Sequence, residues 1–203
     1  MPAEPIDRAD VTGIVLAGGL GRRMSADGQG IDKGLQPFRG RAMVEHAIER
    51  LAPQVCTLVI NANRNLGRYR EFGWPVISDA VEGFAGPLAG LHAGMRRART
   101  RFVVTVPCDS PFLPLDLVAR LSAALAATPG ARLAVARTGT QAHPVFALVE
   151  RALLDDLEAF LASGRRKIDA WYAPLRVVEV DFDDESAFRN INTPQELREQ
   201  EPE

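Results

Sequence analysis

The fold is decided near the start of the chain, in the stretch Gly13-Ile14-Val15-Leu16-Ala17-Gly18-Gly19-Leu20-Gly21-Arg22-Arg23-Met24. Residues 11–17 form a short apolar run that stops at glycines, which is typical of a buried strand rather than a helix. The glycines tolerate a positive φ and leave no side chain in the way of a ligand. Two arginines follow, and Lys33 comes after a polar segment that contains glycine. A strand that opens into bare backbone N–H groups and cations predicts a polyphosphate site.

Two familiar phosphate-binding patterns do not match this stretch. A Walker loop requires G-x-x-x-x-G-K-[ST], but Lys33 is preceded by Asp32 and followed by Gly34. A dinucleotide fingerprint requires G-x-G-x-x-G, and Met24 stands at the third glycine position. No acidic residue closes an obvious second strand roughly 20 residues further on, as that fingerprint also asks. The loop therefore belongs to neither design.

Composition bounds the class of protein. With 203 residues, 46% hydrophobic and 25% charged, the chain has the make-up of a globular protein with a substantial core. No linker or internal repeat divides it, so we expect one domain over residues 1–203, with residues 1–9 as a disordered tail. A net charge of -2 gives no reason to expect nucleic acid or a membrane surface as a partner.

The cysteines and the terminus point to the cytoplasm. Cys56 and Cys108 lie far apart in apolar runs and form no C-x-x-C pair, so we expect two buried free thiols in a reducing compartment. The N-terminus lacks the apolar core of a signal peptide. No apolar run approaches the roughly 18 residues of a membrane helix. These features predict a cytoplasmic protein.

Hydrophobic periodicity predicts alternating strands and helices. The expected strands are residues 11–17, 55–60, 75–78, 102–106, 133–136, 144–149 and 175–180. The expected helices are residues 42–51, 87–97, 114–127 and 151–161, with a last one capped by Thr193 and begun by Pro194. The regular alternation in the first half predicts an α/β fold with a Rossmann-like, doubly wound, mostly parallel sheet.

Polar residues or glycines lie just past the ends of four of the predicted strands. They are Gly18, Asn61, Asp79 and Asp109. In a doubly wound sheet, ligands bind beyond the carboxyl ends of the strands, so we expect these four positions to meet in one crevice. Each alone would be a common turn residue. The prediction of a ligand site depends on all four together.

Seven blocks of sequence, in order over nearly the whole chain, carry a family resemblance. They are Leu16-Ala17-Gly18-Gly19-Leu20-Gly21-Arg22-Arg23-Met24, Asp32-Lys33-Gly34-Leu35, Asn61-Ala62-Asn63-Arg64, Gly86-Pro87-Leu88-Ala89-Gly90-Leu91, Pro107-Cys108-Asp109-Ser110-Pro111-Phe112-Leu113-Pro114, His143-Pro144-Val145-Phe146-Ala147-Leu148 and Asn190-Ile191-Asn192-Thr193-Pro194. With these blocks the sequence resembles the molybdenum cofactor guanylyltransferases, a branch of the nucleotidyltransferases. The resemblance implies a fold of the nucleotidyltransferase type.

The resemblance implies a reaction and its participants. The family joins GMP, taken from GTP, to the terminal phosphate of molybdopterin (Mo-molybdopterin) and releases pyrophosphate, which yields the guanine dinucleotide form of the molybdenum cofactor. It implies Mg²⁺ as the metal and transient contact with other proteins of molybdenum cofactor biosynthesis. The implied GTP contacts are Leu16, Ala17, Gly18, Gly19, Lys33, Asn61, Asp79 and Asp109. Lys33, Arg23 and Asp109 would be catalytic, with Asp109 as the metal ligand. Asn190 and Asn192, with Arg165 or Arg166, would face molybdopterin.

The implied chemistry needs these types of group. An anionic phosphate attacks an anionic α-phosphate, so like charge is the main obstacle, and Mg²⁺, Lys and Arg would stabilise the negative transition state. A magnesium site often uses only one or two carboxylates beside substrate phosphates, and Asp109 supplies one. No general base is required, because the acceptor phosphate is already ionised.

Several residues keep two interpretations. Arg22 and Arg23 are further phosphate contacts or solvated loop charges. Asp32 orients Lys33 by pairing with it, or is a turn residue. The basic residues 164–167 complete a helix end or contact an anion. The histidines His46, His92 and His143 are interpreted as structural or surface residues.

The spacer before Lys33 and the choice of substrate leave two further points open. Residues 25–32 make a longer spacer than the family usually has, which would leave Lys33 mobile until nucleotide binds. The rival functions are a nucleotidyltransferase that uses CTP or a sugar phosphate acceptor, and a nucleotide-binding regulator without catalysis.

Overall fold

The computed structural model describes residues 5–19, 31–80, 86–192 and 195–196. Its strands are β1 (Val11–Leu16), β2 (Pro37–Phe38), β3 (Arg41–Ala42), β4 (Thr57–Asn61), β5 (Val76–Ile77), β6 (Phe102–Pro107), β7 (Leu133–Thr138), β8 (Gln141–Glu150) and β9 (Val177–Asp181). Its α-helices are α1 (Met43–Leu51), α2 (Leu66–Arg70), α3 (Pro87–Arg97), α4 (Leu117–Ala127), α5 (Leu154–Ala162) and α6 (Ile168–Tyr172). Short 3-10 turns are η1 (Arg8–Asp10), η3 (Lys33–Leu35), η4 (Ala52–Gln54), η5 (Arg151–Leu153) and η6 (Glu185–Phe188).

The centre of the molecule is a seven-stranded sheet with the order β5-β4-β1-β6-β8-β7-β9. The neighbours β5, β4, β1 and β6 are parallel, β8 is antiparallel to both β6 and β7, and β9 is parallel to β7. The predicted mostly parallel sheet is therefore confirmed. The strand order reverses at β1, since β4 lies on one side of it and β6 on the other. Such a reversal is where an open α/β sheet holds its ligands, beyond the carboxyl ends of the strands.

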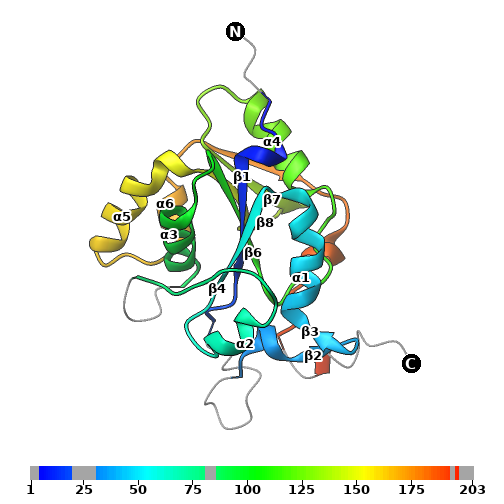
Figure 1. Ribbon diagram of the computed structural model, residues 1–203. Helices are drawn as coiled ribbons and strands as arrows, with labels where there is room; N and C mark the ends of the chain where they lie inside the picture. The colour runs from blue at the N-terminus through cyan, green and yellow to red at the C-terminus, as the bar shows by residue number, and fades with distance from the viewer. Residues whose placement is uncertain (1–4, 20–30, 81–85, 193–194, 197–203) are drawn as a thin grey trace.

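Helices cover both faces of the sheet (Figure 1), which confirms the doubly wound arrangement. One hydrophobic core lies under α1 and α4 and contains side chains such as Val44 and Leu117. A second core lies under α3, α5 and α6, with Leu88, Leu157 and Trp171 among its members. Burying both faces in this way stabilises the sheet and explains why its central strands are apolar on both sides.

Helix α3 packs unusually close to the sheet because it presents glycines there. A Cβ atom at Gly94 would overlap the side chain of Ile14, and one at Gly90 would overlap Leu16 and Asn61. The absence of side chains at these two positions lets the helix lie against the carboxyl end of β1. The helix thus forms part of the wall behind the predicted site.

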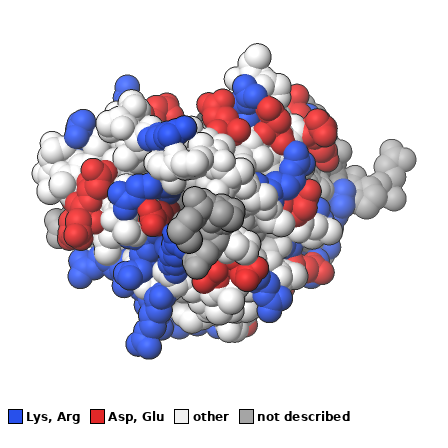
Figure 2. Space-filling view, turned by 90° about the horizontal axis from the view of Figure 1, so that it is seen from above, with Lys and Arg blue, Asp and Glu red and all other residues white. Residues whose placement is uncertain are grey.

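The face at the opposite end of the sheet shows both signs of charge. Figure 2, viewed from above Figure 1, shows basic and acidic side chains interspersed over this surface. This mixture agrees with the nearly balanced net charge of -2.

In the described part of the chain, no helix is long and apolar enough to cross a membrane.

Some details differ from the sequence prediction. Helices α2 and α6 and the β2–β3 hairpin were not predicted, because five or fewer residues are too short to show a period. The tail expected over residues 1–9 is wrong where the structure describes it, since Ile6 packs against the core and Arg8 Nη1 donates to Pro53 O at 3.1 Å. Cys108 is buried as expected, but Cys56 is exposed. The predicted cap at 193–194 lies outside the described residues.

Candidate active site

Two of the four strand-end positions, Asn61 and Asp79, meet with Asn63 in what we call the asparagine cluster. Asn61 closes β4 and is 2% exposed. Its Nδ2 donates to Asp79 Oδ1 at 2.9 Å, and Asn63 Nδ2 donates to Asp79 Oδ2 at 2.8 Å. The backbone N–H of Asp79 donates in return to Asn63 Oδ1 at 2.9 Å. Both carboxylate oxygens are therefore held in place by neutral amides.

The end of β1 lies directly against this cluster. The N–H of Ala17 donates to the carbonyl of Asn61 at 2.7 Å, which extends the pairing of β1 and β4 by one bond. A Cβ atom at Gly18 would lie 2.9 Å from Asn63 Nδ2, closer than Cβ atoms normally approach. Glycine at this position thus lets the backbone after β1 run alongside the amides.

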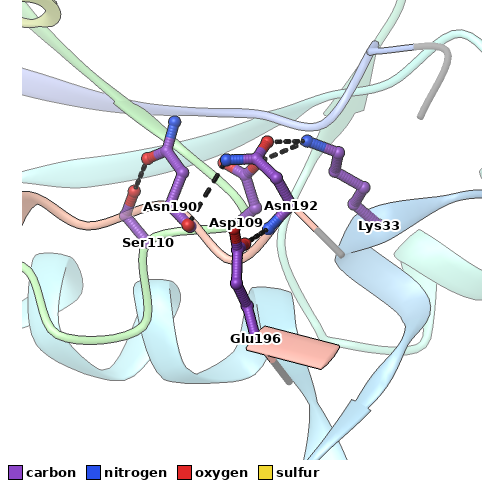
Figure 3. A network of polar contacts seen from close by, with 6 residues as sticks. All are labelled: Lys33, Asp109, Ser110, Asn190, Asn192 and Glu196. Atoms are coloured by element: carbon purple, nitrogen blue, oxygen red, sulfur yellow. Dashed lines mark hydrogen bonds and ion pairs between the residues drawn. The ribbon is translucent and has the colours of Figure 1, made fainter. Parts of the chain in front are cut away.

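The fourth strand end belongs to a second group, which we call the lysine cluster, formed by Lys33, Asp109 and Asn192. Lys33 Nζ lies 2.9 Å from Asp109 Oδ2 and 2.5 Å from Asn192 Oδ1. The Lys33 and Asp109 side chains are 17% and 10% exposed. Figure 3 shows the lysine reaching from one side of the site to both acceptors on the other. A partly desolvated pair of this kind holds its geometry better than a surface ion pair.

The segment 190–192 is tied to the end of β6, although the two are far apart in the sequence. The N–H of Ile191 donates to the carbonyl of Asp109 at 2.9 Å, and Ser110 Oγ donates to Asn190 Oδ1 at 2.5 Å. Ile191 is fully buried in a small apolar cluster with Phe38. The N–H of Asn192 donates to Glu196 Oε2 at 2.6 Å, as Figure 3 also shows. These bonds fix where the amide of Asn192 points.

Asp32 does not pair with Lys33, so that interpretation is wrong. Its carboxylate accepts a hydrogen bond from the Tyr69 hydroxyl at 2.5 Å and another from Asn65 Nδ2 at 2.9 Å. The Lys33 ammonium instead contacts Asp109 and Asn192. The mobility expected of Lys33 before nucleotide binds stays a prediction.

A cavity of about 410 Å³ opens beside the lysine cluster. Its lining comes from the end of β6, the start of β8 and the η6 region, and it comprises Pro107, Gln141, Ala142, His143, Pro144, Val145, Phe146, Glu185, Phe188, Arg189, Asn190 and Asn192. Because Asn192 borders both the cavity and Lys33, a molecule in the cavity can reach the lysine cluster. Asn190 and Asn192, which the sequence analysis expected to face molybdopterin, thus both line this cavity.

His143 has structural partners at the wall of this cavity. Its Nε2 lies 2.7 Å from Thr138 Oγ1, and its ring stacks on Phe188 with centroids 4.7 Å apart. Burial lowers the pKa of the imidazole, and the Glu185 carboxylate offsets only part of that shift. These contacts favour the structural interpretation of His143.

The structure does not bring every predicted residue to the site. Arg22 and Arg23 lie outside the described residues. Arg165 lies over the Phe160 ring, 4.3 Å from its centroid, and Arg166 Nη1 donates to Leu161 O at 2.7 Å. Both arginines thus contact the end of α5, which favours the helix-end interpretation. Sequence reasoning missed Asn65, the N-cap of α2, and Tyr69, within α2, because this helix is too short to leave a pattern.

The comparison with known families agrees with this geometry. Residues 13–177 match the family model described as the MobA-like NTP transferase domain. The chain belongs to this family. It is therefore a nucleotidyltransferase, and the matched range spans both clusters except for segment 190–192.

Individual relatives agree with the family. The chain is 54% identical to a molybdenum cofactor guanylyltransferase of Ralstonia nicotianae, over 95% of this chain and 97% of the relative. It is also 54% identical to the protein of the same name in Cupriavidus taiwanensis, over 95% and 97%. Among solved structures it is similar to molybdopterin-guanine dinucleotide biosynthesis protein A of Archaeoglobus fulgidus, with a TM-score of 0.74, 26% identity, and 93% and 95% of the two chains covered.

Proposed function

We propose that this chain transfers GMP from GTP to the terminal phosphate of molybdopterin, in its molybdenum-loaded form, and releases pyrophosphate. The observation that carries the proposal is the lysine cluster. It joins the ammonium of Lys33, a carboxylate after β6 and an amide of segment 190–192 at one point, and Asn192 of this cluster also lines the cavity. The relatives named molybdenum cofactor guanylyltransferase support the choice of GTP and molybdopterin.

The nucleotide would lie over the end of β1. Leu16, Ala17, Gly18 and Gly19 would offer backbone groups, and the asparagine cluster would contact the base and sugar. In that cluster Asp79 is the charged group, and each of its oxygens accepts one bond from an amide. A carboxylate oxygen has a further lone pair, so Asp79 can also accept N–H or O–H donors from a nucleotide.

Asp109 fits a Mg²⁺ ion that is held jointly with the nucleotide. Its Oδ2 lies 2.9 Å from the Lys33 ammonium, and a carboxylate that already faces a positive charge supports this role. Within the described ranges, no group of three or more His, Cys, Asp or Glu side chains could hold a metal by itself. One carboxylate plus phosphate oxygens and water is a normal set for Mg²⁺. When bound there, the ion would neutralise charge on the α-phosphate and the leaving pyrophosphate.

The transfer needs no proton removal. An oxygen of the molybdopterin phosphate forms a bond to the α-phosphorus of GTP, and the bond from that phosphorus to the bridging β-phosphate oxygen breaks. Pyrophosphate leaves with the electron pair of that bond. Lys33 and, in our proposal, Arg23 would stabilise the negative charge that gathers on the phosphoryl oxygens. Asn190 and Asn192 would orient the acceptor in the adjoining cavity.

The surroundings of the reaction follow from the same proposal. Molybdopterin is made and used by other proteins, so we propose transient contact with other members of molybdenum cofactor biosynthesis. The cytoplasmic location stays a prediction of the sequence.

Pyrophosphate release in the presence of molybdopterin, Mg²⁺ and each of the four nucleoside triphosphates tests the proposal. We expect release with GTP, and formation of the guanine dinucleotide by mass spectrometry. A preference for CTP, or transfer only to a sugar phosphate, would replace this function with the rival nucleotidyltransferase. GTP binding without any transfer would instead indicate a nucleotide-binding regulator.

A further inference from the structure

The position of Lys33 depends on the backbone that carries it. A lysine side chain is long and freely rotating, so a fixed ammonium requires a fixed backbone as well as partners for the charge. Lys33 opens the 3-10 turn η3, in which Leu35 N donates to Asp32 O at 3.2 Å and Gln36 N donates to Lys33 O at 3.1 Å. A turn of three residues has little stability of its own. Something outside it must hold it in place.

The Asp32 side chain makes the connection to the rest of the fold. Both of its carboxylate oxygens are engaged, one by the Tyr69 hydroxyl and the other by Asn65 Nδ2. Both donors belong to α2 or its start, which follows β4 in the chain. Asn65 has a left-handed backbone with φ of 52°, a conformation that asparagine tolerates better than most residues. Each oxygen of the Asp32 carboxylate therefore accepts a hydrogen bond from α2 or its N-cap.

Tyr69 also contacts the other neighbour of Lys33. A Cβ atom at Gly34 would lie 2.5 Å from the Tyr69 hydroxyl oxygen and 3.2 Å from Cys108 Sγ. Only a residue without a side chain fits there, so the Gly34 backbone rests on the hydroxyl and on the residue before Asp109. Tyr69 is fully buried, and burial, with Cys108 and Asp32 nearby, raises its pKa, so the hydroxyl stays a neutral donor.

We infer that Tyr69 and Asn65 are positioning residues, which act through the carboxylate of Asp32 to aim Lys33 at Asp109 and at the phosphates of the nucleotide. The inference rests on the proposed function for the role of Lys33. Asp32 then neither pairs with Lys33 nor only forms a turn, because its carboxylate connects the Lys33 backbone to α2. The contacts on both sides of Lys33 make Tyr69 the central residue of this arrangement.

A double-mutant cycle on nucleotide affinity tests the inference. Binding of GTP with Mg²⁺, in the absence of molybdopterin, is measured by calorimetry for the wild type, Tyr69→Phe, Lys33→Ala and the double variant. We expect Tyr69→Phe to weaken binding about three- to tenfold, as loss of a hydrogen bond to a charged group would. In the Lys33→Ala background the same change should have no further effect, because Tyr69 acts through Lys33. Equal effects in both backgrounds, or no effect in either, would overturn the inference.

Two further variants separate positioning from stability. Tyr172 is the matched control, since its buried hydroxyl donates to Pro144 O at 2.9 Å rather than to Asp32. Tyr172→Phe should lower the melting temperature as Tyr69→Phe does and leave GTP affinity unchanged. Asn65→Gly keeps the left-handed backbone and removes only the amide, so it should weaken GTP binding through the same Lys33-dependent path even if Tyr69→Phe folds poorly. Unchanged affinity in Asn65→Gly would count against the inference.

The failure of the proposed function gives a different result. If GTP were not the substrate, the wild type itself would show no preference for it, and Lys33→Ala would change nothing. If only the positioning role were wrong, the wild type would bind GTP, Lys33→Ala would weaken binding, and Tyr69→Phe would not.

Discussion

The two clusters at the carboxyl edge of the sheet are built in opposite ways. In the asparagine cluster two neutral amides hold one carboxylate, and the hydrogen-bonded residues are 16 or 18 positions apart in the sequence. In the lysine cluster an ammonium holds a carboxylate and an amide that are 76 and 159 positions away. The first has a carboxylate held in place by fixed, uncharged donors. The second holds two opposite charges that a metal ion or a phosphate can separate.

This difference indicates a division of labour within one site. A carboxylate held by amides keeps its shape when a ligand arrives, which suits recognition of a base and sugar. An ion pair can exchange its partners for Mg²⁺ and phosphate, which suits the reacting groups. Binding and chemistry should therefore be separable by mutation, and the first three predictions below test that separation. The predictions run from the largest expected effect to the smallest.

The largest effect should come from Asp109→Ala. Loss of the proposed metal ligand should lower pyrophosphate release by about 10³-fold or more, because the charge on the phosphates is no longer neutralised. Affinity for GTP should fall by much less, since the asparagine cluster remains. Release of pyrophosphate at the wild-type rate would reject the metal role. Circular dichroism of the variant serves as the control for folding.

Asp79→Asn should show the opposite pattern. Each oxygen of Asp79 accepts a bond from an amide, and an asparagine there would turn an N–H₂ group toward another amide. We expect the KM for GTP to rise about tenfold or more while kcat changes less, because this cluster acts in binding. Steady-state kinetics with GTP as the varied substrate measures both. A lower kcat with an unchanged KM would contradict the assignment of the asparagine cluster to binding.

Lys33→Met should change metal binding in the free protein. In the structure the ammonium lies 2.9 Å from Asp109 Oδ2, so Lys33 and a divalent cation compete for the same oxygen. Without the ammonium, we expect Mn²⁺ to bind several-fold more tightly, while transfer is lost because the phosphates lack their cation. Electron paramagnetic resonance of Mn²⁺ titrated into the protein without nucleotide detects this. Asp109→Ala is the matched control and should abolish the gain.

A smaller effect concerns pH and two histidines, the buried His92 and the partly buried His143. Burial lowers the pKa of both His92, in α3, and His143, at the cavity wall. Glu158 and Asp79 oppose the shift at His92 and Arg96 reinforces it. Both ring nitrogens of His92 lack a hydrogen-bond partner in the described structure, although Nε2 lies 3.8 Å from Glu158 Oε1. Neither imidazole is therefore favoured in its charged form.

The sign of the pH effect follows from these lowered values. Below the pKa of the unfolded chain, about 6.5, the unfolded state binds protons that the folded state does not, so stability is present above that value and is lost as the pH falls toward the folded pKa. We expect the melting temperature to drop by about 2–4 °C between pH 7 and pH 5.5 on account of these histidines. His143→Gln should reduce the drop and leave GTP affinity at pH 7 unchanged. If the melting temperature of that variant fell as much as that of the wild type, the pH effect would not come from His143.

Much of the fold could be predicted because its signals are local. The apolar run that became β1, the helix at 87–97 and the strong β pattern of β6 are each readable from neighbouring residues. Their alternation was enough to predict the parallel sheet. The elements that were missed, α2 above all, are too short to show a period, and α2 is stabilised by contacts such as that of Tyr69 with the core.

Part of the candidate site could likewise be predicted from the sequence, and part could not. Asn61 and Asp79 were predicted together because each ends a neighbouring parallel strand. The pairing of Lys33 with Asp109 rather than with adjacent Asp32 was not predicted, because sequence proximity favours the wrong partner. Asp32 is turned away by Tyr69, and no pattern in the sequence shows that contact.

The sequence by itself determined the class of fold, the edge of the sheet where the site lies, and the types of group that the chemistry needs. Hydrophobic periodicity is a property of short stretches, and parallel strands bring their carboxyl ends to one edge whatever else the chain does. Only the tertiary structure decided which charges pair and what holds them. A hydrogen bond is formed or lost within a few tenths of an ångström, and that precision comes from packing among segments as distant as η3, α2, β6 and residues 190–192.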